Sequence, residues 1–352
     1  MQQYGVLYNS LLVQTISENL EWSRLRGARV MITGAAGLIG SFLTDLMMAR
    51  NEHHSGQISV AACVRDLDAA NKRFSVYSEN PNFQLVQYDI TKPFSGADGY
   101  DLILHTASNA SPAQFSKDPV GTLTGLVEGA KNVLDLARTY KARVLILSTG
   151  EIYGRGAPED LPFREDFLGW IDVLSSRSCY PSGKRAMETL CAAYGQQYGV
   201  DSVIARPCHV YGPTATSRDN RASTQFLNDA AAGRDIVMKS QGLQLRSYLH
   251  VADCALALLY ILINGAPHQA YNVASPRSVL TIADFAQKCA MTGGTRVVFE
   301  QPKELERLGY SPSQPQVLDA SKLQSLGFSA RFTPDEGIQN AVDILREQLS
   351  TE

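Results

Sequence analysis

Residues 29–40 read Arg29-Val30-Met31-Ile32-Thr33-Gly34-Ala35-Ala36-Gly37-Leu38-Ile39-Gly40, and this stretch decides the fold. Its first five residues form a short apolar run typical of a buried strand, and helical spacing of apolar residues resumes from Ser41. The glycines permit a sharp turn and let the N–H groups of a helix N-terminus approach a pyrophosphate. The stretch therefore predicts a strand, a turn and a helix that bind a dinucleotide, with a tight turn lacking a ligand as the alternative. The residues expected to contact the dinucleotide are Gly34, Ala36, Gly37, Leu38, Ile39 and Gly40.

The rest of the first 200 residues alternates between short apolar runs and helical stretches. The apolar runs lie at 58–64, 83–88, 101–105 and 143–147, and the clearest helical stretches at 119–140 and 182–199. Such alternation is typical of βαβ units, so we predict an α/β protein with a Rossmann-type, doubly wound parallel sheet.

The pattern becomes irregular after Arg206, with stretches rich in Gly, Pro, Ser and Asn. We expect a smaller, C-terminal substrate-binding domain in this part of the chain. The predicted organisation is a helical N-terminal extension over 1–28, a dinucleotide-binding domain over 29–206 and a mainly substrate-binding domain over 207–352, interleaved with the first.

Composition excludes several classes of protein. Of the 352 residues, 44% are hydrophobic and 19% charged, a globular balance, and the net charge of −3 provides no basic field for nucleic acid. No apolar run approaches the roughly eighteen residues of a membrane span, and the N-terminus lacks signal-peptide features. We expect a cytoplasmic enzyme with no membrane partner. The six cysteines are scattered without metal-ligand spacing, so we expect reduced thiols and no metal site.

The pair Tyr180 and Lys184 is the first candidate for catalysis. The two residues stand four positions apart at the start of a helical stretch, and therefore on one face. A free tyrosine has a pKa of about 10, and a neighbouring ammonium together with a nicotinamide cation lowers it. Tyrosinate can then act as a base. The alternative is an amphipathic helix with a buried phenol.

The second predicted strand ends in Cys63-Val64-Arg65-Asp66 and leaves the choice of cofactor open. An NAD enzyme normally has an acidic residue there for the ribose hydroxyls. Arg65 can instead pair with the 2′-phosphate of NADP, whereas a solvated Arg65 would leave the ribose contact to Asp66. We expect NAD, with NADP as the competitor.

The spacing G-x-x-G-x-x-G resembles the short-chain dehydrogenase/reductase superfamily, and further motifs sharpen the likeness. They occur in the order seen in extended members that act on nucleotide sugars, and they span most of residues 29–290. The segment HTASNASPAQFSKDP, with the helix around Tyr180, is most similar to UDP-glucuronate decarboxylases, and then to dTDP-glucose 4,6-dehydratases and 4-epimerases. The four motifs are STGEIYG (148–154), YPSGKRAME (180–188), RPCHVYGP (206–213) and RSYLHVAD (246–253).

This resemblance implies a tightly held NAD+ that oxidises C4 of the sugar and later returns the hydride. It implies that Tyr180 takes the C4 hydroxyl proton, that Lys184 holds the tyrosine anionic and binds the nicotinamide ribose, and that Thr149 hydrogen-bonds the reacting oxygen. Further cofactor contacts implied by the family are Arg65, Asp89, Ile90, Thr106, Ala107, Ser108 and Pro207.

The resemblance also implies the substrate contacts Ser111, His209 and Arg246. Arg246 would bind the pyrophosphate of the sugar nucleotide, with a surface ion pair as its alternative role. The family normally has Asn where this chain has His209, a substitution that leaves the substrate's identity open.

Gly150 and Glu151 bear on the reaction type. Related dehydratases have an Asp-Glu pair after the threonine, and the Asp is the acid for the departing 6-hydroxyl. Here Gly150 has no proton to give, so dehydration loses its usual acid. Decarboxylation needs no such acid, because a 4-keto group beside a C5 carboxylate is already an electron sink. Simple C4 epimerisation needs neither residue, and a structural Glu151 facing solvent is the remaining alternative.

Two other functions compete with a nucleotide-sugar enzyme: an NADP-dependent carbonyl reductase and a non-catalytic dinucleotide sensor. Relatives dimerise through the helices that correspond to 119–140 and 182–199, and both stretches have more apolar positions than one sheet-facing stripe needs. We therefore expect a homodimer. The apolar positions are Val120, Leu123, Leu126, Val127, Val133, Leu134, Met187, Leu190, Cys191, Tyr194 and Tyr198.

Overall fold

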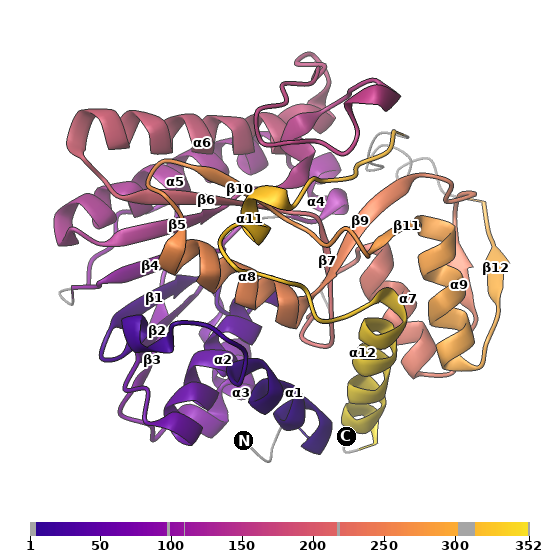
Figure 1. The fold of residues 1–352 in the computed structure, drawn as a ribbon, viewed down its shortest axis with the longest axis horizontal. Helices are drawn as coiled ribbons and strands as arrows, with labels where there is room; N and C mark the ends of the chain where they lie inside the picture. Colours follow the sequence, from indigo (N-terminus) through magenta and orange to yellow (C-terminus); the bar gives the residue numbers. More distant parts are fainter. Residues whose placement is uncertain (1–4, 97–98, 109, 217–218, 302–313, 351–352) are drawn as a thin grey trace.

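A seven-stranded parallel sheet forms the centre of the protein in a computed structural model that describes residues 5–96, 99–108, 110–216, 219–301 and 314–350 (Figure 1). Every neighbouring pair is parallel, in the order β10-β6-β5-β4-β1-β2-β3. This confirms the Rossmann-type doubly wound sheet. Its strands are β1 (Arg29–Thr33), β2 (Ser59–Val64), β3 (Phe83–Gln87), β4 (Leu102–His105), β5 (Arg143–Leu147), β6 (Ser202–Pro207) and β10 (Ala270–Val273).

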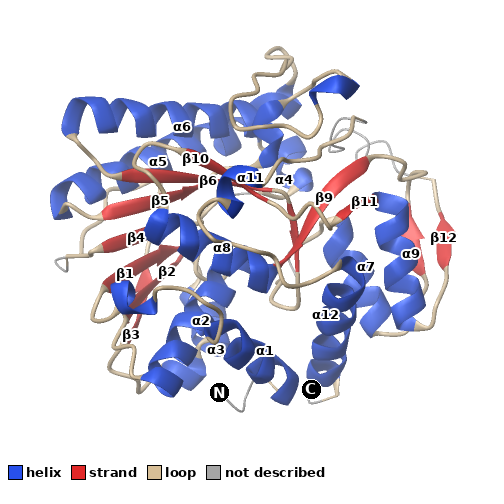
Figure 2. Ribbon diagram, in the orientation of Figure 1, coloured by secondary structure: helices blue, strands red, loops and turns tan. Residues whose placement is uncertain are grey.

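Helices cover both faces of this sheet because successive strand side chains point to opposite sides (Figure 2). Val30 and Ile32 of β1 belong to a buried cluster with α2 (Leu38–His54) and α8 (Val251–Asn264). The intervening Met31 belongs to a second cluster, with α5 (Pro119–Tyr140) and α6 (Cys179–Tyr198). A short helix α3 (Leu67–Arg73) follows β2, and α4 (Pro112–Lys117) precedes α5.

The N-terminal segment folds back onto the body of the protein. Helix α1 (Val6–Ile16) packs against α2, α8 and α12 (Pro334–Leu349). The Tyr8 hydroxyl donates to the buried Asp45 carboxylate at 2.6 Å, and Glu347 accepts from the Val6 and Leu7 N–H groups, each at 2.9 Å. The two ends of the described chain are therefore neighbours (Figure 1). Residues 1–4 of the predicted extension lie outside the described residues.

The C-terminal part has a core of its own, which lies beside the large sheet (Figure 1). A three-stranded sheet contains β7 (His209–Tyr211), β9 (Leu245–His250) and β11 (Val279–Thr281), and β8 (Ile236–Met238) pairs with β12 (Val297–Phe299). Helices α7 (Ala222–Ala231), α9 (Ile282–Gly293) and α12 pack on one another, and the short α11 (Ser321–Gln324), which precedes α12, contacts β10.

Strand β10 and helix α8 come from this C-terminal part of the sequence but pack on the large sheet. The domain limits 29–206 and 207–352 stay a prediction, and residues 302–313 and 351–352 of the second range lie outside the described residues. Within the described part of the chain, none of the helices has the length and apolar character needed to cross a bilayer.

Candidate active site

The glycine turn between β1 and α2 is shaped by close backbone contacts. Gly34 has a φ of +70°, and a Cβ atom there would lie 2.7 Å from the Ala107 Cα atom. A Cβ atom at Gly40 would lie 2.9 Å from the Ala35 Cα atom, so neither position accepts a side chain. A Cβ atom at Gly37 would meet nothing closer than the Gly34 carbonyl oxygen at 3.3 Å. Gly37, the N-cap of α2, is exposed beside the first-turn N–H groups of Leu38 and Ile39, which have no intrahelical partners and fit a pyrophosphate.

The end of β2 places Arg65 and Asp66 at the surface. The Asp66 carboxylate caps α3 by accepting the Ala69 N–H at 3.1 Å. Asp89, after β3, accepts the N–H and the hydroxyl of Thr91 at 3.0 and 2.9 Å, and these bonds hold the pKa of its carboxyl below the usual range. The carbonyl of Ile90 accepts from the Asn132 side-chain amide at 2.8 Å.

The loop after β4 is bound to the end of β1. Thr106 donates its N–H and its hydroxyl to the Thr33 carbonyl at 3.2 and 2.7 Å, and the Ala107 N–H donates to the Thr33 hydroxyl at 3.4 Å. Ser108 is half-buried in the same loop. Because Ala107 also touches Gly34, the predicted cofactor residues 34–40 and 106–108 lie together.

Tyr180 and Lys184 are both buried on α6, with side chains toward each other. The Lys184 Nζ lies 5.8 Å from the centre of the Tyr180 ring and donates to the Leu147 carbonyl at 2.6 Å. Burial lowers the pKa of Lys184 to about 7, against a smaller opposing effect of Glu188. The Tyr180 ring stacks on Phe115 of α4, with centroids 4.5 Å apart and planes 19° apart.

Burial also raises the pKa of Tyr180 above its ordinary value, and the charge of Glu151 raises it further. A hydrogen bond with Thr149 and the charges of Arg221 and Arg177 act in the opposite direction. Thr149 is therefore in contact with the tyrosine. With burial dominant, the isolated protein keeps Tyr180 protonated, so its use as a base depends on positive charge brought into the site.

Glu151 forms an ion pair that the sequence analysis did not predict. Its two carboxylate oxygens accept from the Arg177 Nη2 at 3.1 and 2.8 Å. Arg177 also lies over the Phe115 ring, 4.9 Å from the ring centre. The Glu151 N–H donates to the Thr149 hydroxyl at 3.2 Å, which fixes the short helical turn Gly150–Tyr153. Glu151 is thus neither fully solvated nor without a partner.

The predicted substrate residues come from three elements: Ser111 is the N-cap of α4, His209 begins β7 and Arg246 lies in β9. Arg246 is buried, not at the surface, and donates to the carbonyls of Leu245 and Gln314 at 3.0 and 2.5 Å. His209 packs beside Tyr248, and burial together with nearby arginines lowers its pKa to about 3, so its ring is neutral. Ser111 donates to the Asn220 side chain at 2.9 Å, and Pro207 ends β6.

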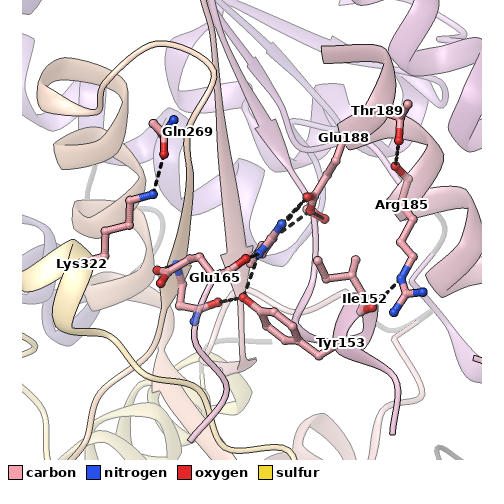
Figure 3. A network of polar contacts seen from close by, with 11 residues as sticks. Ile152, Tyr153, Glu165, Arg185, Glu188, Thr189, Gln269 and Lys322 are labelled. Atoms are coloured by element: carbon pink, nitrogen blue, oxygen red, sulfur yellow. Dashed lines mark hydrogen bonds and ion pairs between the residues drawn. The ribbon is translucent and has the colours of Figure 1, made fainter. Parts of the chain in front are cut away.

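A second polar network includes Glu188 of α6, Tyr153 and Glu165 (Figure 3). Glu188 accepts from Ser148 at 2.5 Å and from Arg206 Nη2 at 2.6 Å. Arg206 also donates to the Tyr153 hydroxyl at 3.0 Å and to the Glu165 carbonyl at 2.8 Å. This network connects α6 and β6 to the loop that carries Tyr153.

Four further residues of the site were missed by sequence reasoning: Phe115, Arg177, Glu188 and Arg221. Phe115 and Glu188 fall inside motifs quoted above, and Arg177 precedes Tyr180 by three positions. That spacing is the one signal that could have pointed to Arg177. Nothing in the sequence indicates that these side chains meet Tyr180, Glu151 or Arg206.

Comparisons with known proteins identify the family of the chain. The model of the "NAD dependent epimerase/dehydratase family" matches residues 30–274. UDP-glucuronic acid decarboxylase 1 of Danio rerio is 34% identical over 326 residues, 91% of this chain and 73% of that protein. UDP-glucuronic acid decarboxylase 6 of Arabidopsis thaliana is 30% identical over 313 residues, 88% of this chain and 86% of that protein.

Solved structures share the fold. The dTDP-glucose 4,6-dehydratase of Bacillus anthracis in complex with NAD has a TM-score of 0.75 at 18% identity, covering 92% of this chain and 98% of that one. The UDP-glucuronic acid 4-epimerase of Bacillus cereus with UDP-glucuronic acid and NAD has a TM-score of 0.74 at 19% identity, covering 91% and 99%. These matches do not favour the alternative of an NADP-dependent carbonyl reductase. The chain belongs to the NAD-dependent epimerase/dehydratase family.

Proposed function

We propose that this chain oxidises C4 of a nucleotide sugar and that its overall reaction is the decarboxylation of UDP-glucuronate. The observation that carries the proposal is the grouping of Tyr180, Lys184 and Thr149 at the carboxyl end of β5. Glu151 lies beside them. The activity named for the relatives at 30% and 34% identity supports the choice of substrate.

The proposed cofactor is NAD. The exposed Gly37 and the first turn of α2 would take the pyrophosphate, while Asp89 and the 106–108 loop would lie along the adenine and nicotinamide halves. A bound nicotinamide would accept a hydride from C4 and return it in the last step. Arg65 makes NADP the competitor, because its exposed guanidinium can reach a 2′-phosphate.

Tyr180 would take the C4 hydroxyl proton, and Thr149 would hold the same oxygen. Burial lowers the pKa of Lys184 to about 7 in the protein without cofactor. Its ammonium form would be favoured by hydroxyl and phosphate oxygens that the cofactor brings. Once charged, it stabilises the anion of Tyr180. The proposed substrate contacts are Arg246 for the pyrophosphate, with His209 and Ser111 nearby.

Gly150 and Glu151 support decarboxylation over dehydration. After C4 oxidation, the C5 carboxylate leaves as carbon dioxide, the bond's electron pair moves to the C4 carbonyl, and C5 then gains a proton. Glu151 is the group proposed to move that proton. Gly150 cannot protonate a departing hydroxyl, and a Cβ atom there would lie 3.1 Å from Leu318, so this position packs against the C-terminal segment.

Reaction with UDP-glucuronate in heavy water tests the function. Decarboxylation must install a solvent-derived deuterium at C5, whereas 4-epimerisation by hydride return installs none. We expect a pentose nucleotide with deuterium, detected by mass spectrometry. A uronate epimer without deuterium would identify an epimerase, and a 6-deoxy-4-keto product from dTDP-glucose would overturn the inference from Gly150.

We also propose a homodimer through α5 and α6. Packing of these helices on each other and on the sheet buries most of the apolar positions named above, but Val120, Leu123 and Tyr198 stay exposed at 72%, 37% and 41%. These three side chains are available for a second copy. Light scattering at micromolar concentration is expected to give twice the chain mass, and a monomer mass would reject this assembly.

A further inference from the structure

Two side chains, Arg177 and Phe115, connect Glu151 to Tyr180 through three successive contacts. Glu151 is held by Arg177 from the short helical turn Ser176–Ser178, and Arg177 lies over the Phe115 ring of α4. Phe115 in turn stacks on Tyr180 of α6. Each contact is between neighbours in space, so a change at Arg177 reaches both the carboxylate and the tyrosine.

Arg177 is well placed but incompletely bonded. Its side chain is 16% exposed, yet its Nε–H is buried and has no hydrogen-bond partner among the described residues. A buried donor without an acceptor is costly in a purely structural network. This arrangement is typical of a site that a ligand completes.

The charges of Arg177 and Glu151 act on Tyr180 in opposite directions. Glu151 disfavours the tyrosine anion, and Arg177 favours it, as does Arg221. Lys184 on the same helix and the Thr149 hydroxyl are the other polar groups that face the ring. Arg177 contacts both Glu151 oxygens, and its charge offsets part of the effect of Glu151, while Thr149 and Arg221 oppose it more strongly. Removing Arg177 alone would leave the carboxylate charge opposed only by Arg221 and Lys184.

We propose that Arg177 is a positioning residue of the reaction: it holds Glu151 by both oxygens and braces Tyr180 through Phe115. This inference rests on the proposed C4 oxidation. It goes beyond it by assigning a role to a residue that acts through two others and by predicting that Glu151 becomes inhibitory when Arg177 is lost.

The test compares Arg177→Gln, Glu151→Gln and the double variant, each purified with its own cofactor and mixed with UDP-glucuronate. The rate of C4 oxidation is read from the absorbance of reduced nicotinamide. Arg177→Gln is expected to slow this step on the order of tenfold, the effect of about one pKa unit on the tyrosine. The double variant is expected to recover to within about threefold of Glu151→Gln, because no uncompensated charge remains.

Two further variants sharpen the comparison. Arg177→Lys keeps the positive charge but loses the planar guanidinium over Phe115, so it should slow C4 oxidation less than Arg177→Gln does. Arg155→Gln is the matched control, because Arg155 also lies over an aromatic ring, that of Trp170 at 5.1 Å, without contacting Glu151 or Tyr180. It should leave the rate unchanged. A double variant as slow as Arg177→Gln, or an Arg177→Gln rate equal to that of the wild type, would overturn the inference.

A readout that does not depend on activity separates this inference from the proposed function. Urea unfolding of the wild type, Arg177→Gln, Glu151→Gln and the double variant gives the coupling between Arg177 and Glu151. This coupling should amount to at least about a threefold factor in the unfolding equilibrium constant. Absence of cofactor reduction in the wild type would reject the proposed function alone. Absence of coupling would reject the pair, whatever the activity.

Discussion

Two arginine–glutamate pairs differ in their hydrogen bonding: Glu188 belongs to α6 itself, and Glu151 and Arg177 belong to short helical turns that precede it. The pairs Glu188–Arg206 and Glu151–Arg177 are similarly buried, with side-chain exposures of 12% and 11% against 20% and 16%. Glu188 and Arg206 share further bonds with Ser148, Tyr153 and the Glu165 carbonyl (Figure 3). The Arg177 Nε–H, in contrast, is buried without an acceptor among the described residues.

The two pairs are thus distinguished less by burial than by whether every polar atom of the arginine has a hydrogen-bond partner among the described residues. A fully bonded network fixes the backbone around it, since every lost partner leaves a buried charge. An incompletely bonded pair contributes less to stability and keeps a donor for a ligand. The Glu188 network therefore holds α6 in place, and the Glu151 pair is the one that we propose to take part in the reaction.

The largest expected effect is on the rate of C4 oxidation. Tyr180→Phe should lower the rate of C4 oxidation about a thousandfold, because the proton of the C4 hydroxyl loses its acceptor. Stopped-flow absorbance of the reduced nicotinamide measures this. Tyr194→Phe is the matched control, since Tyr194 is on the same helix but donates to Asp135 at 2.7 Å. A Tyr180→Phe rate above a tenth of the wild-type rate would assign the base elsewhere.

On the structural side, Glu188→Ala should lower the free energy of unfolding by about 3 kcal/mol, because it leaves the buried Arg206 without a carboxylate. The matched Glu151→Ala should cost less, about 1 kcal/mol, since the Glu151 carboxylate accepts from one side chain of the described residues, Arg177, whereas Glu188 accepts from both Ser148 and Arg206. Urea unfolding of both variants measures the two costs. Equal losses would remove the distinction between the pairs.

The burial of Lys184 on α6 should affect the pH dependence of stability. Its pKa is lowered from 10.5 to about 7 by burial, so between these values the unfolded chain binds a proton that the folded chain lacks. Stability then rises with pH in that window, and below it both states are protonated. Relative to Lys184→Met, the wild type should gain roughly 2 kcal/mol from pH 7 to pH 9 without added cofactor. Parallel curves for the two proteins would show that Lys184 stays charged.

The smallest effect is expected at Arg65, which is exposed and belongs to neither pair. Extraction of the purified protein should release NAD or NADH, and Arg65→Ala should change NAD affinity by less than about threefold, as is usual for exposed charges. Calorimetric titration of the stripped protein measures the affinity. Release of only the phosphorylated dinucleotide would reverse the assignment, and Arg65→Ala should then weaken binding strongly.

The sequence by itself determined the strands β1 to β5 and the face that carries Tyr180 and Lys184, whereas no strand was predicted at β6. Both follow from local rules: apolar runs separated by helical spacing give βαβ units, and residues four apart on a helix share a face. The turn at 34–40 was equally readable, because its glycines lie between an apolar run and a helical stretch, and the contact at Gly40 is with Ala35 of the same turn. Such signals lie within a few neighbouring residues.

Only the tertiary structure decided the contacts that give the site its charge balance. Glu151 and Arg177 are 26 positions apart, and Phe115 reaches Tyr180 from a helix 65 positions earlier. The addition of β10 to the edge of the sheet next to β6 likewise joins segments with no shared local pattern. The physical reason is that ion pairs and ring stacks depend on where packing brings elements together, and packing sums many weak contacts over the whole chain.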